Sequence, residues 1–256
     1  FDRTIELDPT TAQPHYDKGL ALIHLGRYLE AVASFDRLLE MIPSYAPAFF
    51  HKGRALAQVG MYNEAVFAYN INLEITPDDP EVLYHKGIAL AHMENHEDAI
   101  SAFEAACTIT PLKADTCYQS GLSRAALGRH QEAVSSFNRA LEIDPGHTDA
   151  VYHKGLSLAE LGEFNEAIQA LTTALEKTPA IANAWLIKGF CLFAIGSYQE
   201  AVISYKASLE LDEKNPHTWF YQGRAHLNLG NIEDSVHSFD QALALEPEFG
   251  EAFYYR

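Results

Sequence analysis

Histidines are the first side chains in this chain whose number and spacing invite a chemical interpretation. The 256 residues include 12 of them, and an imidazole can bind a metal ion or transfer a proton near neutral pH. His92 and His96 have the i, i+4 spacing that places two rings on one face of a helix. His96, however, occupies a register position that aromatic residues such as Tyr28 and Tyr62 fill elsewhere. We therefore expect His96 to point into the core, and we predict no metal site.

Other side chains that could perform catalysis form no recognisable motif. The sequence contains neither Gly-x-Ser-x-Gly nor a glycine-rich phosphate loop. Cys107, Cys117 and Cys191 form no Cys-x-x-Cys pair and fall at packing positions or within a helix. We expect them to be reduced core thiols of a cytoplasmic protein, with a disulfide between Cys107 and Cys117 as the alternative. The sequence thus predicts no catalytic residue, no cofactor and no enzymatic activity.

The balance of charged residues limits the kinds of molecule that this chain is expected to bind. The chain has 18 Lys and Arg against 35 Asp and Glu, which gives a net charge of −17 and opposes binding to a phosphate backbone. No apolar run is long enough to span a bilayer. We expect no nucleic acid and no membrane partner. The acidic residues Asp78, Asp79, Glu81 and Asp115 favour a neutral or basic protein ligand.

The elements that must position these side chains recur every 34 residues. The period is marked by Gly19, Gly53, Gly87, Gly121, Gly155, Gly189 and Gly223. If each of these glycines is counted as position 8, most units have Gly at position 15, a small residue at position 20, a large residue at position 24 and Pro at position 32. This pattern predicts two amphipathic helices joined by a turn. Two exceptions are Glu94 at position 15, where we expect the turn to shift to Asn95, and Glu213 at position 32, where we expect a longer boundary before Pro216.

On these positions the chain resembles the tetratricopeptide repeat family. The resemblance implies an all-α fold, a right-handed solenoid of stacked antiparallel helix pairs, over residues 1–256. Residues 1–11 are expected to be the tail of a preceding repeat, and residues 250–256 the start of an eighth. The complete repeats are expected at 12–45, 46–79, 80–113, 114–147, 148–181, 182–215 and 216–249.

The expected functional surface is the stripe formed by positions 2, 5, 9 and 12 of each first helix. In the resembling family this stripe lines the concave groove that holds extended peptides. Position 5 is aromatic in most repeats, and the sixth repeat adds the apolar residues Leu186, Ile187, Phe190 and Phe193. Aromatic residues are favoured recognition anchors. The candidate peptide-binding residues are Tyr84, Tyr118, Tyr152, Leu186, Ile187, Phe190, Phe193, Phe220, His85 and His153. The alternative is that these side chains fill the space between neighbouring helices.

The sequence therefore predicts a non-catalytic protein-interaction scaffold that binds a peptide or partner helix in the concave groove. Two alternatives stay open. The chain could be the substrate-recruiting repeat domain of a larger enzyme such as a glycosyltransferase. It could also be a solenoid that self-associates end to end, because neither end shows a polar capping helix.

Overall fold

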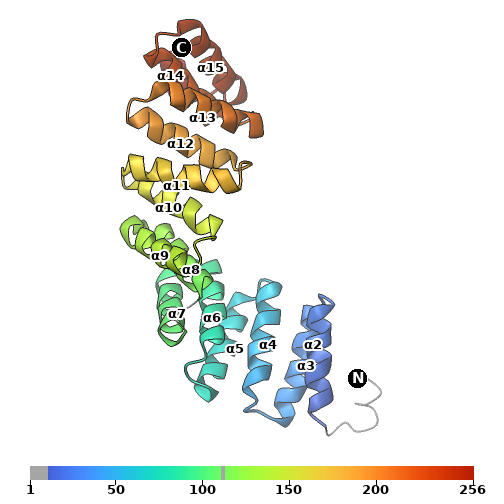
Figure 1. The fold of residues 1–256 in the computed structure, drawn as a ribbon. Coiled ribbons are helices and arrows are strands. Elements are labelled where there is room, and N and C mark those ends of the chain that lie inside the picture. The colour runs from blue at the N-terminus through green and yellow to red at the C-terminus, as the bar shows by residue number, and fades with distance from the viewer. Residues whose placement is uncertain (1–10, 111–112) are drawn as a thin grey trace. The chain divides into compact units, whose positions relative to one another are not determined.

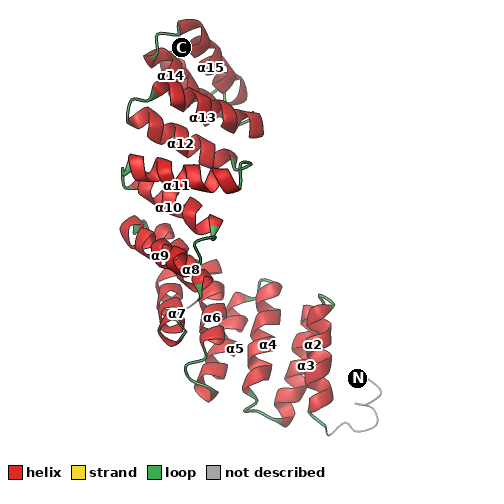
Figure 2. Ribbon diagram, viewed as in Figure 1, coloured by secondary structure: helices red, strands yellow, loops and turns green. Residues whose placement is uncertain are grey.

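A computed structural model describes residues 11–110 and 113–256, and all regular secondary structure in these ranges is helical (Figures 1 and 2). The all-α prediction is confirmed. The predicted tail of a preceding repeat, apart from Thr11, lies outside the described residues, and so does Pro111 at the end of the third repeat.

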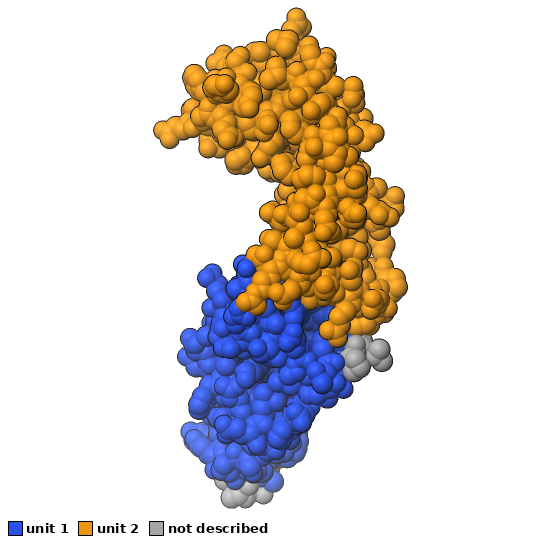
Figure 3. Space-filling model, turned by 90° about the vertical axis from the view of Figure 1, so that its left-hand side faces the viewer, with its two compact units in different colours: residues 1–127 blue, residues 128–256 orange. Residues whose placement is uncertain are grey.

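The chain divides into two compact units, residues 1–127 and residues 128–256 (Figure 3). The helices of the first unit are α2 (Gln13–His24), α3 (Tyr28–Met41), α4 (Ala46–Gln58), α5 (Tyr62–Ile75), α6 (Pro80–His92), α7 (His96–Ile109) and α8 (Ala114–Ala126). Those of the second unit are α9 (His130–Ile143), α10 (Thr148–Glu160), α11 (Phe164–Lys177), α12 (Ala182–Ala194), α13 (Tyr198–Leu211), α14 (Pro216–Asn228), α15 (Ile232–Leu245) and α16 (Gly250–Tyr255). The division falls within the fourth predicted repeat, so a continuous solenoid across it stays a prediction.

Close packing within the helix pairs of each unit follows from the small residues of the repeat. At Gly53 in α4, a Cβ atom would lie 2.6 Å from Cε1 of Tyr69 in α5, which is far closer than a real carbon contact. The ring of Tyr69 is fully buried, and so is Ala65 at position 20 of the same repeat. Glycine and alanine therefore let the two helices approach until an aromatic ring fills the space between them.

The turn inside the third repeat corrects one expectation. Glu94 itself adopts the left-handed conformation, with φ of 59°, whereas Asn95 has φ of −83°. The Asn95 amide donates to the Leu90 carbonyl at 3.0 Å, just as the Met61 amide donates to the Leu56 carbonyl at 3.0 Å in the second repeat. The predicted shift to Asn95 is wrong, because these hydrogen bonds keep the turn in the same register.

The boundary before Pro216 corrects a second expectation. Helix α13 ends at Leu211 and α14 begins at Pro216, a separation no longer than that between Ile75 of α5 and Pro80 of α6. The side chain of Asn215 accepts a hydrogen bond of 3.2 Å from the Thr218 amide. This N-cap fixes the start of α14 even though position 32 lacks a proline.

The two helices of a repeat occupy different places in the stack. Within the first unit, α2 lies next to α4, α4 next to α6 and α6 next to α8, and within the second unit α10 lies next to α12 and α12 next to α14. Second helices such as α11 and α13 pack on the first helices beside them. Among the described residues of each unit, consecutive second helices make fewer contacts with each other than consecutive first helices do. The first helices thus form the tighter layer of each unit, the side on which the predicted stripe lies.

Candidate functional site

In the second unit, α10, α12 and α14, together with the turn before α11 and its first residue Phe164, line a groove with a volume of about 550 Å³. We call it the sixth-repeat groove. Its lining residues are Leu156, Ala159, Glu160, Gly162, Phe164, Asn183, Leu186, Ile187, Phe190 and Tyr221. Most of these side chains are apolar, which makes the groove suited to the burial of apolar ligand groups.

Phe190 is at the centre of the aromatic contacts in this groove. Its ring meets Phe164 edge-on at a centroid distance of 6.1 Å and Tyr221 at 5.9 Å. Ile187 and Phe190 also pack against a buried cluster that includes Ala174 and Cys191, yet both remain only partly buried. The inner side of each of these two side chains is therefore fixed by the core, while the outer side stays available to a ligand. Such preorganised side chains lose little conformational freedom on binding.

The polar groups of the groove lie at its edges. Asn183 donates a hydrogen bond of 2.8 Å from Nδ2 to the hydroxyl of Tyr152 on the preceding first helix, which holds position 2 of one repeat against position 5 of another. Glu160 is exposed at the end of α10, and it is the one charged residue among the described residues that line the groove. The groove therefore combines an apolar floor with a negative charge at one edge.

Four predicted residues of the second unit do not line the groove, namely Tyr152, His153, Phe193 and Phe220. Phe193 packs on Tyr198 at 5.2 Å and lies under the guanidinium group of Arg224 at 5.0 Å, and it does not line the groove. Phe220 is only 1% exposed and is surrounded by Phe239, Phe249 and Tyr255. This burial argues against the predicted ligand-binding role of Phe220, because a ligand cannot reach its ring.

The predicted histidines pack against aromatic rings. His85 lies between Phe50 and Tyr69, at centroid distances of 5.5 and 6.5 Å. Burial, together with the positive charge of Arg54, lowers the pKa of His85 to about 4. His153 lies against Tyr152 at 4.9 Å and Phe137 at 6.2 Å, and burial lowers its pKa as well. Both imidazoles are therefore neutral near pH 7 and act as packing groups between rings.

The remaining candidates, Tyr84 and Tyr118, belong to the first unit and are half-buried. Tyr84 packs on Phe103 at 6.1 Å, and burial raises the pKa of its hydroxyl, with a smaller contribution from the Asp115 carboxylate. The role of these two tyrosines in ligand binding stays a prediction. Asp79, one of the four acidic residues expected to favour a neutral or basic ligand, caps α6 by accepting hydrogen bonds from the amides of Glu81 and Val82. Its carboxylate therefore has a structural role.

The pair His92 and His96 shows no chelating arrangement. The ring of His92 stacks on Tyr62 of the preceding repeat, with a centroid distance of 4.8 Å and an interplanar angle of 7°. The described ranges contain no group of three or more His, Cys, Asp or Glu side chains placed to hold a metal ion.

Seven groove residues were not among the predicted ligand-binding residues, namely Leu156, Ala159, Glu160, Gly162, Phe164, Asn183 and Tyr221. Tyr221 stands at position 6, where His51, His85 and His153 stand in other repeats, and this substitution was a usable signal. Phe164 was assigned only to packing, since its position is aromatic in most repeats. Glu160 carries no signal in the repeat pattern.

Comparison with known proteins identifies the class. The family described as tetratricopeptide repeat matches residues 1–46, 16–70, 50–114 and 152–216 with one sequence profile, and residues 114–147 and 216–249 with another. These matches span most of the chain. The chain belongs to the tetratricopeptide repeat (TPR) family. A comparison with curated proteins gave no match.

Solved structures show the same fold. The chain is similar to the C-terminal part of a TPR repeat-containing protein from Cytophaga hutchinsonii, with a TM-score of 0.78, 16% identity, and coverage of 94% of this chain and 98% of that one. It is similar to YrrB, a TPR protein with an unusual peptide-binding site, with a TM-score of 0.67, 22% identity, and coverage of 74% and 97%. It is also similar to MamA, with a TM-score of 0.61, 26% identity, and coverage of 63% and 95%.

No helix within residues 11–110 and 113–256 has the length and apolar character needed to cross a bilayer.

Proposed function

We propose that this TPR protein is a non-catalytic interaction scaffold that holds a peptide or a partner helix in the sixth-repeat groove. The observation that carries the proposal is the convergence of Leu186, Ile187 and Phe190 with Tyr221 on one concave surface. Family membership supports a scaffold that binds proteins. The thiols of the three buried cysteines favour the reducing cytoplasm as its location.

The groove favours a ligand with an apolar anchor and a basic neighbour. Phe190 and its aromatic contacts provide the surface that buries the apolar side chain. Glu160 lies at the edge and can pair with a lysine or arginine. The net charge of −17 adds a long-range attraction for basic partners. The ligand that we propose for the sixth-repeat groove is therefore a neutral or basic peptide.

Selection from a random peptide library displayed on phage supplies a ligand for the test. The enriched peptide is titrated by calorimetry into the parent protein and into Phe190→Ala. We expect the variant to bind about tenfold or more weakly, a cost of about 1–3 kcal/mol, because the ring is a central anchor. Phe67→Ala is the matched control, since Phe67 is an exposed phenylalanine of α5 in the first unit.

A second variant tests the charge preference. Glu160→Gln should weaken binding of a peptide that contains lysine or arginine and should reduce the salt dependence of its affinity. If no peptide is enriched, or if Phe190→Ala binds every enriched peptide as well as the parent does, the sixth-repeat groove is not the binding site.

A further inference from the structure

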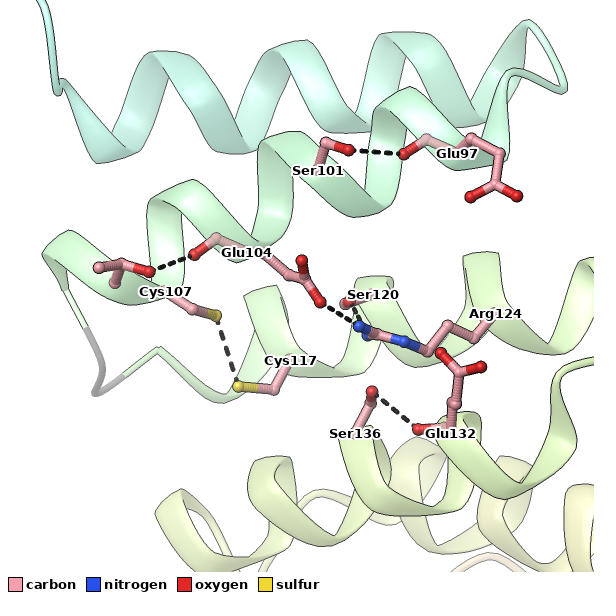
Figure 4. A network of polar contacts seen from close by, with 10 residues as sticks. Glu97, Ser101, Glu104, Cys107, Cys117, Ser120, Arg124, Glu132 and Ser136 are labelled. Carbon is pink, nitrogen blue, oxygen red and sulfur yellow. Dashed lines mark hydrogen bonds and ion pairs between the residues drawn. The ribbon is translucent and has the colours of Figure 1, made fainter.

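Two cysteine sulfur atoms face each other at the junction of the third and fourth repeats, a feature that the peptide-binding proposal does not use. Cys107 lies in the last turn of α7 and Cys117 in the first turn of α8. Their Sγ atoms are 3.6 Å apart (Figure 4). Since a disulfide bond is about 2.05 Å long, the two sulfur atoms must approach by about 1.5 Å to form one.

The surrounding contacts keep the two thiols together. Helices α7 and α8 pack against each other, and the carboxylate of Glu104 on α7 forms an ion pair with Arg124 on α8, which also donates to the hydroxyl of Ser120 (Figure 4). Both cysteines are buried: the exposed fraction is 7% for Cys107 and 2% for Cys117. Burial slows the reaction of these thiols with bulky thiols of other molecules, whereas the two sulfur atoms are already in contact with each other.

We propose that Cys107 and Cys117 are a peroxide-responsive dithiol that closes to a reversible disulfide between α7 and α8. The more exposed Cys107 reacts first: its sulfur attacks one oxygen of hydrogen peroxide, the O–O bond breaks, and a sulfenic acid and one water form. Cys117 then attacks the Cys107 sulfur, the S–S bond replaces the S–O bond, and a second water leaves. The two thiols lose two electrons and two protons, and the peroxide gains them.

The placement of Cys117 suits it to the second step. It lies in the first turn of α8, where the amino-terminal end of the helix dipole stabilises a thiolate. Its neighbour Tyr118 is one of the candidate ligand-binding residues of the first unit. The disulfide therefore adds a covalent link between two repeats that are otherwise held by helix packing and by the ion pair of Glu104 and Arg124, next to a predicted contact residue.

Peptide mapping tests the proposal directly. The reduced chain is treated with hydrogen peroxide, quenched with catalase, unfolded, alkylated with iodoacetamide and digested. We expect a linked peptide containing Cys107 and Cys117, with Cys191 alkylated, and we expect Cys191→Ser to give the same link. Cys117→Ser should leave a Cys107 sulfenic acid that dimedone captures. A parent protein in which both thiols are alkylated, or are oxidised further without the link, overturns the proposal.

An equilibrium measurement separates this dithiol from a merely accessible pair. The parent chain is equilibrated with reduced and oxidised glutathione, once folded and once in urea, and the disulfide fraction gives the effective concentration of the two thiols. Because the fold holds the sulfurs together, we expect the folded value to be at least about tenfold higher. An equal or lower value contradicts the proposal, and this test does not depend on any variant that fails to fold.

Discussion

At the scale of single residues, Glu94 carries a backbone conformation that its side chain disfavours. Six equivalent turns have glycine with φ between 71° and 84°, whereas Glu94 has φ of 59°. A residue with a Cβ atom pays about 1–2 kcal/mol in this region. The protein accepts this cost because the hydrogen bond from the Asn95 amide to the Leu90 carbonyl fixes the turn.

Glu94→Gly should therefore stabilise the protein. The gain should be about 1 kcal/mol, since relief of the strain is partly offset by the greater freedom of glycine in the unfolded chain. Urea unfolding monitored by circular dichroism measures it. Gly128→Ala, which introduces the same strain at an equivalent turn, should lower the unfolding midpoint. A lower midpoint for Glu94→Gly would show that its side chain stabilises the turn.

His85 should give the stability of the protein a measurable pH dependence. Its pKa is about 4 in the folded chain, lowered by burial and by Arg54, and near 6.5 when unfolded. The unfolded state therefore binds the proton more tightly, and stability should fall as the pH drops below about 6.5 toward 4. Between pH 7 and pH 5 the parent should lose about 2 kcal/mol more than His85→Gln, because only the parent carries this imidazole. Parallel losses in thermal melts of both proteins would contradict the assigned pKa.

At the scale of helices, position 20 controls the distance within a pair. Ala201 in α13 is fully buried and packs in a cluster with Leu192 of α12 and Tyr205. Three added carbon atoms at this point have no space, because the helices already touch through small residues.

We expect Ala201→Leu to cost about 1–3 kcal/mol of unfolding free energy through overpacking. Chemical denaturation of the variant measures this cost. Ala194→Leu is the matched control, because Ala194 lies exposed at the end of α12 and offers the larger side chain free space. A variant at position 201 as stable as the control would show that the contact between α12 and α13 is looser than described.

At the scale of the whole molecule, a repeat protein has no single central core. Each helix pair packs on the pairs next to it, so stability is close to a sum of local terms. The buried residues accordingly form a series of separate clusters, such as one around Phe35 and another around Tyr205. Damage to one cluster should therefore stay local.

Hydrogen exchange measured by mass spectrometry tests this locality with Phe35→Ala. The lost ring of a fully buried side chain should cost about 3–5 kcal/mol and speed the exchange of amides in α2, α3 and α4. The amides of α12 and α13 should exchange at the parent rate. The exposed Phe67→Ala provides the control. Equal acceleration in all helices would show that the chain unfolds as one cooperative unit.

The sequence by itself determined the repeat and the contacts inside the helix pairs of each unit. Glycine at position 8 and a large residue at position 24 meet in the structure, as at Gly53 and Tyr69, because these contacts depend only on helical spacing and on the turn between two consecutive helices. The same local rules placed the turns at the position 15 glycines, all six of which have positive φ.

Only the tertiary structure decided which face of each first helix remains open. Phe190 at position 9 and Phe220 at position 5 both belong to the predicted stripe, yet Phe190 lines the sixth-repeat groove and Phe220 is covered by Phe249 and Tyr255. Tyr221 reaches the groove from the following repeat. The rotation of one repeat on the next decides this exposure, and it depends on the packing of side chains from separate repeats, which a periodic pattern within one repeat does not contain.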